Sequence, residues 1–236
     1  MSIINPNAQM LILSTSTVHG SGFLEYIQSE LKVFLKGKKL TFVPYARPSG
    51  ISHDEYTQKV AEAFQKIDIE VEGLHTFENP QEAIQNAEAV FIGGGNTFLL
   101  LKTLYEKNLM EALKNEIYKG TPYIGSSAGS NITGITIGTT NDMPITYPPS
   151  FDALGILPFN INPHYLDPDP NSTHKGETRA TRIQEFHQFN AYKVVGLREG
   201  SWLEVKEGKI TLKGPHSARI FEADKEAYEH NSQTEI

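Results

Sequence analysis

The chain has 236 residues, of which 39% are hydrophobic and 21% charged, and its formal net charge at pH 7 is −7. We expect one soluble domain, residues 1–236, that is large enough for a substantial core, and the acidic balance argues against nucleic-acid partners. The lack of cysteine excludes disulfides, zinc–thiolate sites and thiol nucleophiles.

The sequence also argues against a membrane protein. No apolar run approaches the roughly 20 residues that a membrane-spanning helix needs. Residues 1–7 lack the basic and apolar regions of a signal peptide. We therefore expect a cytoplasmic protein, either a monomer or a homodimer, that associates with no membrane.

The first half of the chain alternates short apolar runs with helical patterns. Strands are predicted at 9–14, 40–44, 67–74, 89–92 and 122–124, and helices at 23–35, 53–66, 80–86, 98–105 and 109–118. This alternation predicts an α/β fold, a three-layer sandwich whose mostly parallel central sheet has helices on both faces. Sites in such sheets form at the carboxyl ends of the strands.

The second half is less regular. Its patterns predict strands at 135–140, 159–163 and 193–197, a helix at 177–189, and a hairpin at 201–213 with its turn at Glu207-Gly208. From about residue 224 the sequence is polar, which predicts a frayed tail. We find no internal repeat and no low-complexity linker, so one domain is the simplest interpretation.

A turn motif follows the predicted strand at 122–124. Residues Gly125–Gly129 read Gly-Ser-Ser-Ala-Gly, the G-x-S-x-G pattern of a nucleophile on a tight turn between a strand and a helix. The central Ser127 would project from this turn, and the Ala128 N–H that follows is placed to bind an oxyanion. A Ser/Gly turn without chemistry has the same pattern, so the surroundings of the motif have to decide.

A glycine run, Gly93–Gly95, follows the strand predicted at 89–92 and should therefore lie on the same sheet edge as Ser127. A dinucleotide-binding turn would need a third glycine where Phe98 stands, and no Walker lysine follows. A second oxyanion donor fits better, because glycine lets the backbone approach a ligand closely. Metal-binding patterns of the H-E-x-x-H or EF-hand type are also missing. We expect neither a cofactor nor a metal.

A serine nucleophile needs a base within hydrogen-bond reach and an acid that orients the base. Among eight histidines, His164 stands out because it directly follows the apolar run 159–163. The runner-up, His174, lies in a polar, glycine-containing stretch that favours a binding loop. Glu199 and Asp142 each follow a predicted strand, and either could be the acid or a plain turn residue.

Taken together, these motifs resemble the peptidase E family of aspartyl dipeptidases. The resemblance rests on five segments in order: 92–98, 125–131, 140–145, 161–164 and 174–179. It implies a serine peptidase of the cytoplasm that cleaves dipeptides after an N-terminal L-aspartate. It also implies a flavodoxin-like sandwich related to class I glutamine amidotransferases, with serine in place of their cysteine.

The resemblance also implies roles for the residues. Ser127 would be the nucleophile and His164 the base, and the third member would be Glu199 or Asp142. We favour Glu199 as the direct partner of the histidine, with Asp142 as an essential residue nearby.

For the substrate, the family pattern implies an oxyanion hole and a cation. The hole would combine the Ala128 N–H with that of Gly94 or Gly95. Arg179 matches the position that holds the substrate aspartate, and a guanidinium can grip a carboxylate with two hydrogen bonds.

One departure concerns specificity: the family often has an aromatic residue where this chain has Ser126. Three alternatives stay open: a cyanophycinase-like or isoaspartyl peptidase on the same fold, a non-catalytic module that binds an acidic ligand, and a general α/β-hydrolase esterase. The esterase is disfavoured because its histidine typically follows the last strand, whereas more strands are predicted after His164.

Overall fold

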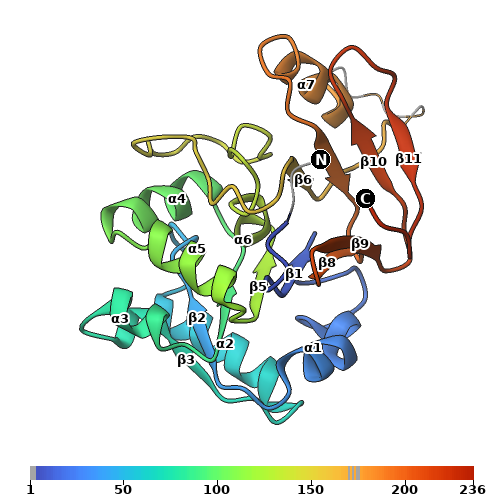
Figure 1. The fold of residues 1–236 in the computed structure, drawn as a ribbon. Helices are drawn as coiled ribbons and strands as arrows, with labels where there is room; N and C mark the ends of the chain where they lie inside the picture. The colour runs from blue at the N-terminus through green and yellow to red at the C-terminus, as the bar shows by residue number, and fades with distance from the viewer. Residues whose placement is uncertain (1–3, 170, 172, 174–175) are drawn as a thin grey trace.

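The structure is a computed structural model that describes residues 4–169, 171, 173 and 176–236. Its larger sheet has seven strands in the order β3-β2-β4-β5-β1-β8-β9 (Figure 1). Five of them run parallel: β1 (Met10–Leu13), β2 (Leu40–Val43), β3 (Val71–Gly73), β4 (Ala89–Ile92) and β5 (Tyr123–Ser126). The hairpin strands β8 (Trp202–Lys206) and β9 (Lys209–Lys213) add antiparallel to β1.

Helices cover both faces of this sheet, which confirms the predicted three-layer α/β sandwich. On one face α1 (Gln28–Leu35) and α2 (His53–Gln65) share a buried cluster with β1, β2 and β4. The other face packs against α3 (Pro80–Gln85), α4 (Thr97–Glu106) and α5 (Met110–Lys119). Every residue of β1, β2, β4 and β5 is buried, as expected for strands between two helical layers.

The remaining elements are short. A helix of one turn, α6 (Ala128–Asn131), follows β5, and α7 (Arg179–Phe186) follows the chain segment beyond β6. Two 3₁₀ turns, η1 (Glu25–Ile27) and η2 (Leu74–Thr76), complete the helical elements of the described residues.

A second sheet, which the sequence patterns did not separate from the first, has the order β11-β10-β7-β6. It pairs β6 (Asn160–Pro163) parallel to β7 (Val194–Leu197) and adds β10 (Ala218–Phe221) and β11 (Tyr228–His230) antiparallel. Figure 1 shows it beside α7, at the upper right of the molecule. Buried residues of β6 and β7 belong to the same apolar cluster as those of β1 and β4. Because the two sheets share a core, we propose that they form one domain.

Three expectations from the sequence are wrong. Residues 135–140 form a loop and not a strand. Thr136 makes only an isolated bridge, to Asp152, and the Thr139 side chain, in place of a backbone ladder, bonds to the Ile161 carbonyl. The strand expected at 67–74 is confined to β3, since a turn at Asp68, with φ 63°, precedes it.

The tail from residue 224 is not frayed. It contributes β11, and the Ile236 N–H donates to the Ile210 carbonyl of β9. The Glu229 carboxylate of β11 also pairs with Arg198 at 2.8 Å and with Arg219 at 3.2 Å. These ionic contacts order a segment that composition alone describes as polar.

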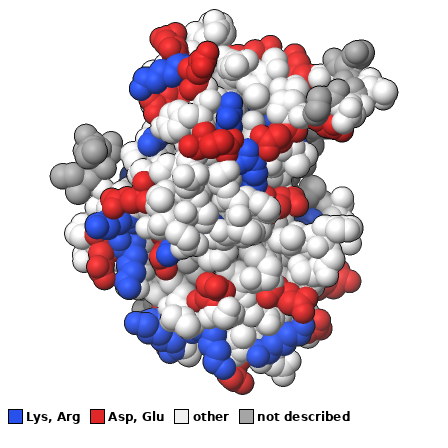
Figure 2. Space-filling view, turned by 90° about the vertical axis from the view of Figure 1, so that its right-hand side faces the viewer, with Lys and Arg blue, Asp and Glu red and all other residues white. Residues whose placement is uncertain are grey.

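The outer surface carries both signs of charge. Figure 2 looks onto the side of β11 and the β8–β9 hairpin, where acidic and basic side chains are intermingled around a largely uncharged centre. Within the described residues, no helix is long and apolar enough to cross a membrane.

Candidate active site

The turn between β5 and α6 presents Ser127 in a strained conformation, with φ 53° and ψ −107°. A Cβ atom at Gly125 would lie 2.5 Å from the Gly129 carbonyl oxygen, and one at Gly129 would overlap the Ile92 carbonyl. The turn therefore requires glycine at both ends of the motif, as the sequence predicts. The Ser127 N–H donates to the Leu13 carbonyl at 3.2 Å, which ties the turn to the end of β1.

His164 and Glu199 come from the second sheet. They follow β6 and β7, two parallel neighbours whose last residues, Pro163 and Leu197, are in register. His164 adopts a left-handed conformation, with φ 54°. This conformation turns the chain out of the strand direction immediately after the ladder ends.

The three side chains form one hydrogen-bonded chain. His164 Nε2 lies 2.8 Å from Ser127 Oγ, and His164 Nδ1 lies 2.6 Å from Glu199 Oε1. The imidazole can therefore take the hydroxyl proton through one nitrogen while the carboxylate fixes its orientation through the other. The histidine and glutamate side chains are 36% and 44% exposed, so a substrate can reach them.

The Asp142 carboxylate has a different set of partners. It accepts the Thr97 N–H at 2.7 Å, the Thr97 hydroxyl at 2.6 Å and the Thr140 hydroxyl at 3.1 Å. Thr97 is the first residue of α4, where the helix dipole favours a negative charge. Asn96, which caps α4, also donates to the Met143 carbonyl. The structure thus brings Glu199 to His164 and uses Asp142 to dock a loop onto α4.

The candidate oxyanion donors lie beside Ser127. A Cβ atom at Gly94 would be 3.1 Å from the Ser127 Cβ. The Tyr56 hydroxyl donates to the Gly94 carbonyl at 3.1 Å and fixes the orientation of that peptide group. In the described part of the chain, neither the Gly94 N–H nor the Gly95 N–H makes a backbone hydrogen bond. The Ala128 N–H opens α6, so it has no acceptor within the helix.

Arg179 is the first residue of α7, where the Thr178 hydroxyl accepts the Thr181 N–H. Burial lowers the pKa of Arg179, the nearby Arg182 guanidinium lowers it further, and the Asp142 carboxylate raises it. Arg179 is therefore a half-buried cation within electrostatic reach of the docked loop. The binding loop expected at His174 lies outside the described residues.

Sequence reasoning missed Ser14, which follows β1 and is fully buried. Its hydroxyl accepts the His164 N–H at 2.9 Å. The only signal in the sequence is a serine at the end of an apolar run, and such a serine equally well begins a loop.

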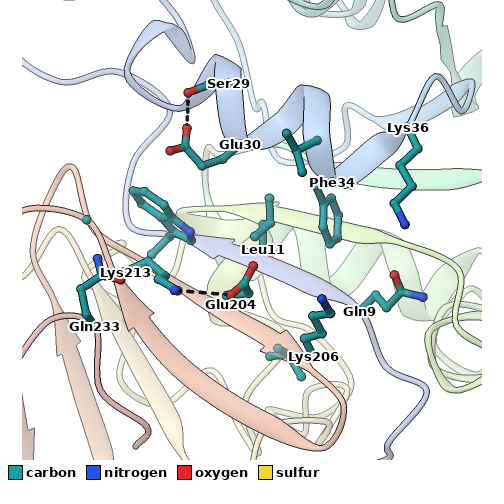
Figure 3. Close-up of a pocket in the computed structure, with 14 residues that line it drawn as sticks. Gln9, Leu11, Ser29, Glu30, Phe34, Lys36, Glu204, Lys206, Lys213 and Gln233 are labelled. Carbon is teal, nitrogen blue, oxygen red and sulfur yellow. Dashed lines mark hydrogen bonds and ion pairs between the residues drawn. The ribbon is translucent and has the colours of Figure 1, made fainter.

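A cavity lies away from the candidate catalytic residues. It has a volume of about 510 Å³ and opens between α1 and the β8–β9 hairpin, where Figure 3 shows Phe34 beside Leu11 and Lys213 directed toward Glu204. Of the described residues that line it, none is a candidate catalytic residue. Among the described residues, no three His, Cys, Asp or Glu side chains gather in a way that could hold a metal ion.

Comparison with known proteins gives consistent matches along the chain. Residues 10–213 match the model of peptidase family S51. A probable alpha-aspartyl dipeptidase of Drosophila melanogaster is 48% identical over 219 residues, which cover 91% of this chain and 90% of that protein. Peptidase E of Streptomyces coelicolor is 50% identical over 213 residues, covering 90% and 86%. A solved structure of a putative peptidase E protein from Listeria monocytogenes superposes with a TM-score of 0.68 at 22% identity, covering 88% of this chain and 98% of that one, and supports the fold.

Proposed function

The chain belongs to peptidase family S51, and we propose that it acts through Ser127 as nucleophile, His164 as general base and Glu199 as the acid that orients the base. Its relatives named peptidase E or alpha-aspartyl dipeptidase are up to 50% identical to it. It is accordingly a serine-type dipeptidase that hydrolyses dipeptides after an N-terminal L-aspartate. The observation that carries the proposed roles is the hydrogen-bonded chain from Glu199 through His164 to Ser127.

The reaction follows from this geometry. Ser127 Oγ attacks the carbonyl carbon of the aspartyl residue while His164 Nε2 takes its proton. As the tetrahedral intermediate collapses, His164 gives that proton to the leaving amine of the second residue. A water then attacks the aspartyl ester, again with His164 as base, and free aspartate leaves.

The charge that develops on the carbonyl oxygen needs donors that are already in place. We propose the Ala128 N–H and the N–H of Gly94 or Gly95 for this role, because these backbone groups flank the serine and are not used in the described backbone hydrogen bonds. Fixed donors of this kind stabilise the transition state without reorganisation. Loss of one such donor typically lowers kcat about 10²- to 10³-fold.

Arg179 is our candidate for recognition of the substrate aspartate. A chain with a net charge of −7 needs a local cation to bind an anionic side chain. The half-buried guanidinium supplies that charge and can hold a carboxylate with two parallel bonds. We propose that the enzyme works on free dipeptides in the cytoplasm, as a monomer or a homodimer.

The test is hydrolysis of a matched panel: Asp-Leu, β-Asp-Leu, Glu-Leu, Asn-Leu and Leu-Leu, with Ser127→Ala as the blank. Turnover of Asp-Leu alone supports the proposal. Because Asn-Leu has nearly the same shape as Asp-Leu without the charge, its rejection would show that the pocket reads the carboxylate.

Two other outcomes have clear meanings. Cleavage of β-Asp-Leu in place of Asp-Leu would identify an isoaspartyl or cyanophycinase-like activity on the same fold. Saturable binding of aspartate without turnover of any member would contradict the peptidase assignment and indicate a binding module.

A further inference from the structure

The end of strand β1 contacts all three segments that carry the proposed catalytic residues. Leu13 closes β1, and its carbonyl accepts the Ser127 N–H at 3.2 Å and the Ser130 hydroxyl at 2.6 Å. The next residue, Ser14, makes contacts in the opposite direction, toward His164 and toward both flanks of Glu199. Two consecutive residues thus lie between the nucleophile and the pair that activates it.

Ser14 bonds to this junction through both its hydroxyl and its backbone N–H. Its Oγ accepts the His164 N–H at 2.9 Å and donates to the Leu197 carbonyl at 2.7 Å. Its backbone N–H donates to the Ser201 carbonyl at 3.2 Å. Leu197 and Ser201 stand two residues before and two residues after Glu199, so Ser14 holds both ends of the segment that presents the glutamate.

These contacts matter because the catalytic residues come from two different sheets. Ser127 follows β5 in the seven-stranded sheet, whereas His164 follows β6 and Glu199 follows β7 in the four-stranded sheet. A strand ladder fixes positions within one sheet only. The distance of 2.8 Å between Ser127 Oγ and His164 Nε2 therefore depends on bonds that cross from one sheet to the other.

Other side chains also bond to the backbone of β6. The nearest of them to the site is the Asn141 amide, which donates to the Pro163 carbonyl at 2.6 Å. The Asn131 amide donates to the Ile161 carbonyl, and the Thr139 hydroxyl donates to the same oxygen. Among the described residues, Ser14 is the one whose side chain bonds to the backbone of His164 itself. It does so where the histidine leaves its strand with φ 54°, a conformation that the ladder does not impose.

We propose that Ser14 is a positioning residue, whose buried hydroxyl aligns the His164–Glu199 pair of the smaller sheet with Ser127 of the larger one. The proposal rests on the proposed serine mechanism and adds to it the device that joins the two halves of the site. Ser14 is fully buried, so it acts through His164 and not through the substrate.

Removal of the hydroxyl should slow the chemical step. In Ser14→Ala the buried His164 N–H loses its acceptor, and the Leu197 carbonyl loses one donor. The backbone around His164 is then free to shift. A displacement of about 1 Å at a reacting group can cost about 100-fold in rate. We expect kcat to fall about 10- to 100-fold with KM little changed, because the substrate does not touch Ser14.

The experiment compares Ser14→Ala, Ser14→Cys and Thr103→Val with the wild-type enzyme. Cysteine keeps the approximate volume of serine but is a weak hydrogen-bonding group, so it removes the bonds without leaving a cavity. Thr103→Val removes a hydroxyl whose hydrogen bond in the described structure goes to the Leu99 carbonyl, within α4. It controls for the stability cost of a lost hydroxyl.

Three readouts are taken at equal fractions folded: kcat and KM on Asp-Leu, the rate at which diisopropyl fluorophosphate modifies Ser127, and the proton NMR signal of the His164 Nδ1–H. That proton is shifted far downfield when a carboxylate shares it, and its loss in Glu199→Gln assigns it. We expect both Ser14 variants to lower kcat and the modification rate and to move or broaden the signal. Thr103→Val should leave all three unchanged.

Wild-type values of all three readouts in either Ser14 variant would overturn the proposal. Failure of both variants to fold would also overturn it, because Ser14 would then act in stability and not in alignment. The serine modification and the NMR signal need no peptide substrate. If the enzyme does not hydrolyse Asp-Leu, the dipeptidase activity is refuted, but these two measurements still test the role of Ser14.

Discussion

The exchange of Glu199 for glutamine separates the two acids that the sequence left open. In the structure Glu199 Oε1 lies 2.6 Å from His164 Nδ1, so the carboxylate accepts a hydrogen bond from Nδ1–H. The unprotonated Nε2 can then take a proton from Ser127. Glutamine keeps the size of the side chain but can present its NH₂ group to Nδ1. The imidazole would then carry its proton on Nε2, which is the wrong tautomer for a base toward Ser127.

The size of the effect follows from the exposure of the pair. Where the acid of a serine triad is buried, the same change lowers kcat about 10⁴-fold. Glu199 is 44% exposed, so water can replace part of its interaction with the histidine. We therefore expect a loss of about 10³-fold in kcat, equivalent to about 4 kcal/mol of transition-state stabilisation.

Asp142→Asn provides the comparison. An asparagine can still accept the Thr97 N–H, and removal of the charge at the start of α4 should cost at most about 1 kcal/mol. We expect kcat to fall less than about ten-fold and KM to rise, because the hydrogen bonds of the Asp142 carboxylate in the described structure go to Thr97 and Thr140 and not to His164, and its charge acts on Arg179.

The assay is steady-state hydrolysis of Asp-Leu by wild type, Glu199→Gln and Asp142→Asn, with Glu204→Gln as the control. Glu204 is a half-buried carboxylate of β8 that pairs with Lys213 at 3.8 Å and is not a candidate catalytic residue, so its loss should leave kcat unchanged. A larger loss of kcat in Asp142→Asn than in Glu199→Gln would refute the reasoning and make Asp142 the acid that orients His164.

Three further predictions concern binding, the turn and pH. Arg179→Lys should raise KM for Asp-Leu more than it lowers kcat, because the bidentate grip on the carboxylate is lost; equal kinetic constants would contradict this in the same assay. Gly129→Ala should lower the free energy of unfolding by at least about 2 kcal/mol, since its Cβ would overlap the Ile92 carbonyl, whereas Gly155→Ala, with open space around it, should cost only about 1 kcal/mol in denaturant titrations. The hydrogen bond from Arg198 holds the pKa of Glu229 at about 2 instead of 4.5. Because the folded pKa is depressed, the stability that Glu229 contributes is complete above about 4.5 and is lost as pH falls to about 2, so Glu229→Gln should lower stability at neutral pH and match wild type near pH 2. A stability difference that stays constant over this range would show that the carboxylate does not titrate with the fold.

Much of the larger sheet can be predicted from sequence because its signals are local. Each parallel strand lies between two helical layers, so it reads as a short continuous apolar run, and each helix carries its own periodic pattern. The serine turn is equally local: the backbone approach at Gly125 and Gly129 permits no side chain, and this requirement is visible as the two glycines of the motif.

The smaller sheet and the junction between the sheets depend on contacts between distant parts of the chain. The polar segment 228–230 becomes a strand because Glu229 meets Arg198, which is 31 residues away in sequence. Ser14 and His164 are separated by 150 residues, and nothing near either residue marks the bond between them. Residues 135–140 have a strand-like composition, but their hydroxyl and amide partners on β6 hold them as a loop. The choice of Glu199 over Asp142 belongs to the same class, since both follow apolar runs and only their positions in space differ.

The most direct test of the central claim compares Ser127→Ala with Ser126→Ala in hydrolysis of Asp-Leu. The two serines are neighbours in the same motif, and in the described structure the buried Ser126 hydroxyl has no hydrogen-bond partner. The proposed mechanism predicts that Ser127→Ala loses turnover to background while its thermal unfolding stays close to wild type, and that Ser126→Ala remains active. Wild-type turnover by folded Ser127→Ala would contradict the assignment of Ser127 as the nucleophile.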